Sequence, residues 1–373
     1  MKRAFLVAGL AWGDEGKGAT VDYLTWKHNA DLVVRYNGGS QAGHNVVTPD
    51  GRHHTFQQFG SGMFHPGVRT HLSRFMLINP MNMMREEEHL REVGITDAWQ
   101  RTTVDPRALI ITPFHREYNR LQSPQGTNSC GHGIGVCRNF HSSFGDMALF
   151  AGDLMDEKLT RKKLVFLQAN LLENATMRGL QAPQLFQDEH AISLFWNNWY
   201  KDWRDLGIIA EPNYLEHVVK RHRVETVIFE GAQGVLLDET HGEDGFNTWT
   251  DCTFNNAYTL LEEAGFGRRS AWDGECTRVG VIRTYYTRHG AGPFPTEDPA
   301  INFPEPHNED ASYQGKFRRG KFDHQLFHKA VGILGGYDML ALNHMDQRIL
   351  RGTPTDKPVL MGVGPTYKDR EEL

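Results

Sequence analysis

The chain has 373 residues, of which 39% are hydrophobic and 23% are charged, and its formal net charge is −6. This composition is typical of a globular protein with a substantial buried core, and it excludes a disordered chain. The negative charge argues against general binding to nucleic acid, whose phosphates are normally met by a basic surface, although local basic loops could still bind a small anionic ligand.

The first residues superficially resemble a short signal peptide, because Lys2 and Arg3 precede the apolar stretch 4–12. Asp14, Glu15 and Lys17 follow at once without a small-residue cleavage site, so the sequence predicts a buried first strand instead. No apolar run reaches the roughly 18–20 residues that cross a bilayer, so no membrane partner is expected. The cysteines form no CxxC pair and no zinc-like cluster, which predicts free thiols and a cytoplasmic protein. They are Cys130, Cys137, Cys252 and Cys276.

Short apolar segments rich in β-branched residues alternate with helix-like segments along the chain. Strands are expected at residues 4–8, 31–35, 75–78, 108–111, 227–230, 279–287, 339–342 and 358–363. Helices are expected at 17–28, 83–93, 113–121 and 323–334. This alternation predicts an α/β fold on a mostly parallel, twisted sheet. Residues 154–223 are mainly helical in pattern, and we interpret them as an excursion from one large domain spanning 1–373 rather than as a separate lobe.

A glycine-rich turn, GLAWGDEGKG at residues 9–18, lies between the first predicted strand and the first predicted helix. Glycines let the backbone approach phosphate closely, the helix N-terminus offers free N–H groups, and Lys17 adds a positive charge. The turn is not a Walker A sequence, because Ala11 stands where GxxxxGK requires glycine. An ordinary strand–turn–helix junction is the plainer interpretation. Asp14 favours a phosphate site, since a carboxylate there suits Mg²⁺ ligation or proton transfer.

A second glycine-rich loop, VVRYNGGSQAGH at residues 33–44, follows the next predicted strand and ends in His44. A surface loop position is the usual interpretation for any one of 19 histidines. Loops that follow neighbouring parallel strands, however, meet at the carboxyl edge of the sheet, where α/β proteins bind their ligands. The two loops therefore predict one site that contains both Asp14 and His44.

These two segments and three later ones resemble the adenylosuccinate synthetase family. WGDEGKG and the loop ending in His44 resemble its N-terminal signature, and FEGAQGVLLD at 229–238 is similar to its FEGAQGxLLD. YTRHGAGPFPTE at 286–297 resembles STRVGAGPFPTE, and GKFRRGKFD at 315–323 resembles its basic loop. The segments follow the family's order over most of the chain. The helical middle is matched least, and the chain is shorter than the common bacterial form, mainly between 346 and 364.

The resemblance implies an adenylosuccinate-synthetase-like fold and a ligase that joins L-aspartate to C6 of a 6-oxopurine nucleotide. The reaction would use Mg²⁺ and GTP (or ATP) and pass through a 6-phosphoryl intermediate. Asp14 would take the proton from purine N1 and bind the metal together with the carbonyl of Gly43. His44 would act as the acid in phosphoryl transfer to the 6-oxygen, and Lys17 would meet the transferred phosphate. This division is chemically sensible, because phosphorylation turns a poor 6-oxo leaving group into a good one.

The resemblance also implies the binding residues. The donor's phosphates would meet Gly13, Glu15, Gly16, Lys17 and Gly18, and its base would meet Asn343, Asp346, Gly364 and Pro365. The purine monophosphate would meet Asn37, Ser129, Cys130, Gln233, Thr248 and Lys316. Aspartate would meet Gln314, Gly315, Lys316 and Arg318. A carboxylate at Asp346 would accept two N–H bonds from guanine and would oppose adenine, which favours GTP.

The chain departs from the family pattern around the monophosphate and aspartate pockets. SCGHGIG at 129–135 stands where the family has TTGRGIG, so Cys130 replaces a threonine and His132 an arginine. Lys316 replaces an arginine, so the two parallel N–H groups that a guanidinium offers to a carboxylate are lost. His344 replaces the lysine of the family's TKLD.

The family's dimer, in which an arginine reaches the neighbouring subunit's nucleotide, implies a homodimer here. That arginine has no clear counterpart: Phe144 stands near its place, and Arg138 is the candidate replacement.

The departures leave the acceptor open. IMP is narrowly favoured, and the alternative is dGMP, as in phage enzymes that make 2-aminoadenylosuccinate for diaminopurine DNA. A catalytically silent nucleotide-binding regulator is an alternative of another class, which the presence of Asp14 and His44 disfavours. A generic GTPase, suggested by Lys17 and the pair Asn343 and Asp346, is disfavoured by the missing Walker A spacing.

Overall fold

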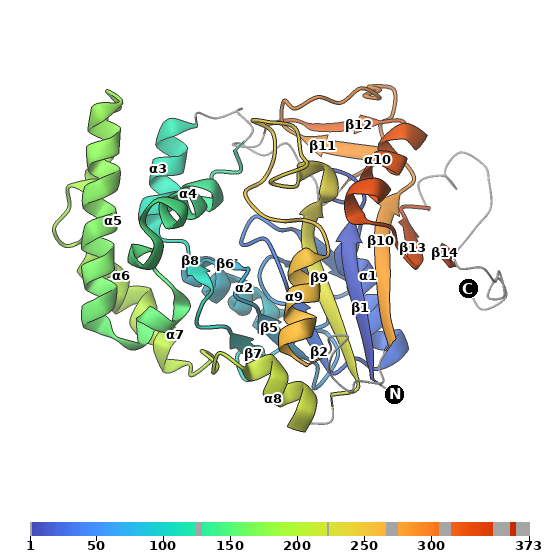
Figure 1. Cartoon of the computed structure of the whole chain (residues 1–373), viewed down its shortest axis with the longest axis horizontal. Helices are drawn as coiled ribbons and strands as arrows, with labels where there is room; N and C mark the ends of the chain where they lie inside the picture. Colours follow the sequence, from blue (N-terminus) through green and yellow to red (C-terminus); the bar gives the residue numbers. More distant parts are fainter. Residues whose placement is uncertain are drawn as a thin grey trace.

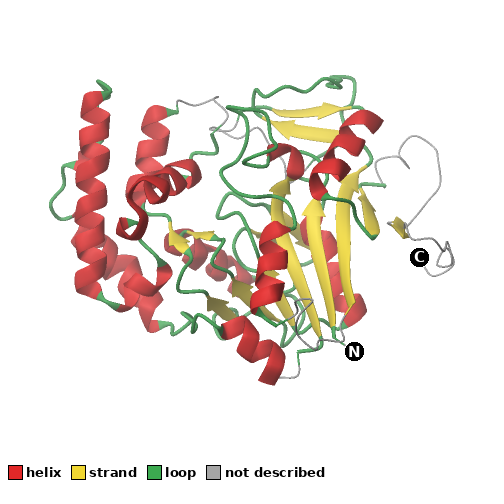
Figure 2. Cartoon of the chain, viewed as in Figure 1, coloured by secondary structure: helices red, strands yellow, loops and turns green. Residues whose placement is uncertain are grey.

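The computed structural model describes residues 2–123, 129–221, 224–265, 275–305, 315–345 and 359–362. At its centre is a sheet with the strand order β14-β13-β10-β1-β9-β2-β5-β7, drawn as yellow arrows in Figure 2. Every neighbouring pair in this order is parallel except β13 and β14. The predicted α/β fold on a mostly parallel sheet is therefore confirmed. The central strands are β1 (Arg3–Gly9), β2 (Leu32–Arg35), β5 (Arg69–Leu72), β7 (Thr102–Val104), β9 (Thr226–Gly234), β10 (Glu275–Arg283), β13 (Met339–Asn343) and β14 (Val359–Gly362).

Three smaller two-stranded sheets accompany the central one. They are β3 (His44–Val47) with β4 (His53–Phe56), β6 (Leu77–Ile78) with β8 (Leu109–Ile110), and β11 (Tyr286–His289) with β12 (Phe317–Gly320). The strands expected at 75–78 and 108–111 thus form a sheet of their own. The strand expected at 279–287 is two strands, because the chain leaves the central sheet after Arg283 and enters the β11–β12 pair.

Both faces of the central sheet are covered, as parallel sheets require. Alternate residues of β1 point to opposite faces: Leu6 belongs to one buried cluster and Val7 to another. The first cluster receives α8 (Tyr214–Arg221), α9 (Asn255–Glu263) and α10 (His324–Leu334), and the second receives α1 (Lys17–His28). The described helices include none long and apolar enough to cross a membrane.

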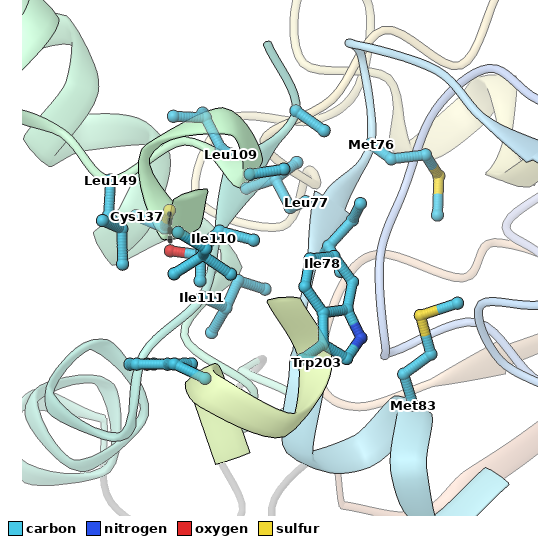
Figure 3. Close-up of a cluster of buried hydrophobic side chains, with 14 of the residues drawn as sticks. Met76, Leu77, Ile78, Met83, Leu109, Ile110, Ile111, Cys137, Leu149 and Trp203 are labelled. Carbon is cyan, nitrogen blue, oxygen red and sulfur yellow. Dashed lines mark hydrogen bonds between the residues drawn. The ribbon is translucent and has the colours of Figure 1, made fainter. Parts of the chain in front are cut away.

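The mainly helical excursion lies beside the edge of the sheet, on the left in Figure 1. It shares a core with β6 and β8, which Figure 3 shows around Ile110, Cys137 and Trp203. The thiol of Cys137 lies 3.6 Å from the carbonyl oxygen of Ile110. Helices in this half are α2 (Pro80–Glu92), α3 (Pro113–Gln122), α4 (Ile134–Phe144), α5 (Glu157–Met177), α6 (Ala191–Phe195), a π-helix (Trp196–Tyr200) and α7 (Lys201–Asp205).

Candidate active site

A cavity of about 1340 Å³ lies where the loops after β1 and β2 meet residues 233–249, β11 and the helices α3, α4 and α5. It brings together most of the predicted site residues that the structure describes. Those lining it are Gly13, Asp14, Gly16, Lys17, Gly18, Gly43, His44, Ser129, Cys130, Gln233, Thr248 and Asn343. Gln314, Asp346, Gly364 and Pro365 lie outside the described residues.

The phosphate turn is built around the buried carboxylate of Glu15. One of its oxygens accepts the backbone N–H groups of Ala11 and Gly13, at 3.0 and 2.9 Å. The other forms an ion pair with Lys17 Nζ at 2.6 Å. A side chain at Gly234 would overlap this carboxylate, which explains glycine there. Glu15 thus organises the turn, and its carboxylate points at its own backbone instead of lining the cavity.

Asp14 stands in the same turn with a left-handed backbone (φ 59°). Its Oδ2 lies 3.2 Å from Nε2 of His289, and its carbonyl oxygen accepts from Arg283 at 3.2 Å. Burial opposes ionisation of Asp14, but the hydrogen bond with His289 and the charges of Arg283 and Lys17 lower its pKa below the ordinary value. Asp14 is therefore a carboxylate at neutral pH, the form that accepts a proton or binds a cation.

His44 faces the same cavity from β3 and is held by Glu230 on β9. Its Nδ1 lies 2.5 Å from Glu230 Oε1, and Glu230 Oε2 accepts the backbone N–H of Ser61 at 2.9 Å. Burial lowers the pKa of His44 to about 4, although Glu230 acts in the opposite direction. The two loops touch directly: a Cβ added at Gly18 would lie 2.7 Å from that of His44. The convergence predicted for these loops is observed.

Gln233 lines the cavity as well, and its side chain has a polar atom that is available to a ligand. Its backbone is left-handed (φ 55°), and its side-chain oxygen is buried without a hydrogen-bond partner in the described part of the chain. A buried amide oxygen without a partner is costly, so a ligand that donates to it would be bound favourably. Thr248 lines the same cavity.

Two residues that were predicted to contact ligands, Asn37 and Asn343, form hydrogen bonds with the protein's own backbone. The amide of Asn37 donates to the carbonyls of Ala232 and Asp251, at 3.1 and 2.9 Å, and accepts from Ala232 N at 2.6 Å. Asn37 is fully buried and does not line the cavity. Asn343 does line it, but its amide donates to the carbonyl of Glu15 at 2.9 Å and so braces the phosphate turn from β13.

Gly315, Lys316 and Arg318 do not line the cavity. Arg318 forms an ion pair with Glu297 at 2.8 Å. Arg138, the candidate replacement for the crossing arginine, pairs with Glu239 of its own chain at 3.1 Å and also lies outside the cavity lining. Arg318 and Arg138 would have to leave these ion pairs to meet a ligand or a partner subunit.

His289 lines the cavity and was not predicted as a site residue. Its ring packs against Phe317, with ring centroids 4.8 Å apart, while Nε2 contacts Asp14. One signal was present in the sequence: His289 stands where the family segment STRVGAGPFPTE has valine. Within a closely matching segment, a histidine in place of an aliphatic residue marks a changed contact.

A phosphate turn, a carboxylate and a histidine at the carboxyl edge of a parallel sheet define an α/β enzyme that acts on phosphate-bearing substrates. The adenylosuccinate synthetase family model matches residues 6–355. Adenylosuccinate synthetase of Nitratidesulfovibrio vulgaris is 30% identical over 363 residues, covering 91% of this chain and 77% of the relative. The chain therefore belongs to the adenylosuccinate synthetase family, the nucleotide-dependent carbon–nitrogen ligases that join aspartate to a purine nucleotide.

Two solved structures share the fold. The fully ligated adenylosuccinate synthetase from Plasmodium falciparum matches with a TM-score of 0.73 and 22% identity, over 92% of this chain and 77% of that chain. The cyanophage S-2L succinoaminodeoxyadenylate synthetase, bound to dGMP and to dATP as an energy donor, matches with a TM-score of 0.60 and 18% identity, over 90% and 83%. At these identities the likeness concerns the fold alone.

Proposed function

We propose that the protein joins L-aspartate to C6 of IMP, using GTP as phosphoryl donor and passing through a 6-phosphoryl intermediate. The observation that carries this proposal is that Asp14, Lys17, His44 and Gln233 all line one cavity. It contains a carboxylate for N1, a histidine held by Glu230, a glycine-rich turn for phosphate, and an amide oxygen that needs a donor.

In the first step, Asp14 takes the proton from purine N1 while the 6-oxygen attacks the terminal phosphorus of the donor. The bond from that phosphorus to the diphosphate breaks, and the purine carries the phosphoryl group at O6. The lowered pKa of Asp14 keeps it ionised for this role. Removing the N1 proton makes the oxygen a better nucleophile.

Burial lowers the pKa of His44 to about 4, so the ring is neutral near pH 7 when no ligand charge acts on it. The negative charge of a bound triphosphate favours a cationic ring, so donor binding raises this pKa. Glu230 holds Nδ1 and leaves the other ring nitrogen for the ligand. Once protonated, His44 stabilises the charge that develops during phosphoryl transfer.

In the second step, the amine of aspartate attacks C6. The C–N bond forms, the C–O bond breaks, inorganic phosphate leaves, and the amine nitrogen gives up one proton to phosphate or solvent. We propose Gly315, Lys316 and Arg318, with Gln314, as the aspartate-binding residues. Arg318 would exchange its ion pair with Glu297 for the substrate's carboxylate.

The residues present fit Mg²⁺. Asp14 and Gly43 both line the cavity, and a carboxylate and a backbone carbonyl are hard oxygen ligands. Mg²⁺ commonly takes few protein ligands and completes its shell with phosphates and water. When bound, it supplies charge neutralisation for the transferred phosphoryl group.

A second acceptor, dGMP, has specific support. Cys130, which departs from the family pattern, lines the cavity, and the neighbouring His132 contacts Ser40 Oγ at 3.0 Å. The cyanophage synthetase with this fold is bound to dGMP. Asp14 and His44 cannot separate the two acceptors, because they need only the 6-oxo and N1–H groups that both purines share. IMP stays the first choice because the family resemblance favours it.

The test is a matrix of IMP, GMP and dGMP with aspartate, Mg²⁺ and each of GTP, ATP and dATP. Product mass and released phosphate are measured. We expect IMP and GTP to give a succinyl-purine product. We also expect the Asp346→Asn variant to lose the preference for GTP over ATP. A dGMP value of kcat/KM about tenfold above that of IMP would replace the proposed acceptor. Equal use of GTP and ATP would contradict the role of Asp346, and no product from any pair would contradict the ligase itself.

A further inference from the structure

The contact between His289 and Asp14 bears on which purine the cavity accepts. His289 Nε2 lies 3.2 Å from Asp14 Oδ2, and the two side chains are 19% and 23% exposed. The other ring nitrogen of His289 is buried and has no hydrogen-bond partner among the described residues. Asp14 is thus the polar contact that orients the ring, and Phe317 fixes its face.

The strand order places the strands that lead to His289 and to His44 on opposite sides of β1, which leads to Asp14. Asp14 follows β1, whose neighbours are β10 on one side and β9 on the other. His289 ends β11, which continues from β10, and Figure 1 shows β11 and β12 beyond the ends of β1 and β10. His44 begins β3, which follows β2 on the far side of β9, and it is bonded to Glu230 of β9.

A 6-oxopurine has an edge with three positions in a fixed order: O6, N1–H and C2. If Asp14 faces N1 and His44 faces O6, as in the proposed function, C2 lies on the side of His289. IMP carries hydrogen at C2, whereas guanine nucleotides carry an amine. The two donors of guanine, N1–H and the 2-amine, match the two oxygens of one carboxylate.

We infer that His289 determines specificity at C2 of the acceptor purine, favouring hydrogen over an amino group. His289 donates to Asp14 Oδ2, the oxygen that the 2-amine of guanine would otherwise use. An amine at C2 would also meet the N–H of His289, so that two donors would face each other. IMP leaves the contact between His289 and Asp14 intact. This inference rests on the proposed function, because it uses the roles of Asp14 and His44.

The decisive comparison is IMP against GMP, which differ only by the 2-amine. We expect the wild-type protein to favour IMP in kcat/KM by at least about tenfold, the discrimination that one unpaired buried polar group commonly supplies. His289→Val should bring this ratio toward one, even where both rates fall. His289→Asn keeps an N–H donor and should keep most of the preference. Binding of IMP and GMP by calorimetry gives the same ratio without turnover.

His65→Val is the matched control, because His65 Nε2 contacts Asp22 at 2.8 Å with similar exposure and lies outside the cavity lining. It should leave both rates unchanged. A ratio that His289→Val does not move, or a wild-type preference for GMP, would overturn the inference and leave the ligase proposal standing. A wild-type protein that neither binds nor converts either nucleotide would overturn both.

Discussion

At the scale of single residues, Asp14 combines an unusual backbone with a proposed chemical role. Asn is among the residues that best tolerate a left-handed backbone such as its φ of 59°. Asp14→Asn should therefore fold normally and lower kcat by about two to four orders of magnitude, as expected for a lost general base. Thermal unfolding and steady-state assays check both parts. Asp50→Asn, at an exposed carboxylate, is the control, and near-normal turnover of Asp14→Asn would remove Asp14 from the mechanism.

For Glu15 we predict an effect on stability, because its carboxylate is wholly buried and forms hydrogen bonds within the turn. Glu15→Gln would leave Lys17 as a buried cation without its partner. Loss of one member of a buried pair typically costs about 3–5 kcal/mol. We expect a large drop in the urea midpoint, whereas Glu216→Gln should barely change it, since Glu216 pairs with Lys220 at the surface. Equal midpoints for the two variants would show that the turn does not depend on Glu15.

Site residues could be predicted from sequence where a motif fixes both the type of residue and its place at the end of a strand. Asp14 and His44 follow strands that end at one edge, so their convergence could be expected. The partners of Asn37 and Asn343 could not be predicted, since an amide bonds a ligand or a carbonyl equally well. The family resemblance implied a phosphate contact for Glu15, but it gave no sign that the carboxylate faces inward and accepts N–H groups of its own turn. His289 gave only the weak signal of a histidine replacing valine.

At the scale of elements, helix α1 and strand β3 meet at Gly18 and His44. A Cβ at Gly18 would come within 3.0 Å of the backbone of His44, so Gly18→Ala should displace the histidine loop. We expect a clear loss of activity in a folded protein. Gly332→Ala in α10 is the matched control, because nothing lies within 4 Å of its added Cβ. That change should stabilise by about 0.5–1 kcal/mol through helix propensity. Full activity of Gly18→Ala would show that the contact is not required.

The predicted elements succeeded where the pattern was long and failed where it was short. Helix α1 was predicted at its observed bounds, because the glycine-rich turn at residues 9–18 marks its start. Strands β5 and β7 were missed, since Arg69, His71 and Thr102 interrupt any apolar run. Their neighbours in the sheet, and not their own residues, make these segments strands. Helix α4 was missed for a related reason: it begins inside a glycine-rich loop and carries several polar residues.

At the scale of the whole molecule, we propose a homodimer, as the family resemblance implies. Arg138 pairs with Glu239 of its own chain, so it can serve a neighbouring subunit only by leaving that partner. Light scattering at micromolar concentration should give twice the mass of one chain. Arg138→Ala should then lower activity more than Arg161→Ala, whose arginine pairs with Glu157 within helix α5. A fully active monomer would contradict the proposed assembly.

The whole molecule should also lose stability in mild acid, because burial or partial burial makes four histidines resist protonation. Burial lowers the pKa of His44, His71 and His132 to about 4 and that of His115 to about 3. In the unfolded chain each would titrate near 6.5, so between pH 6.5 and 4 the unfolded state binds the extra protons. Stability is therefore fully present above pH 6.5 and falls as the pH drops, by up to about 1.4 kcal/mol per pH unit for each histidine.

Urea unfolding at pH 7.0 and pH 5.0 measures this loss, and the difference between the two free energies should exceed what one titrating group can supply. His71 offers the cleanest test, since it lies on β5, outside the cavity lining, and its Nδ1 contacts Thr103 Oγ1 at 3.0 Å. His71→Asn keeps a polar side chain but cannot titrate, so its pH dependence should be shallower by about one proton. A protein equally stable at both pH values would show that these rings are already protonated in the fold or reachable by water.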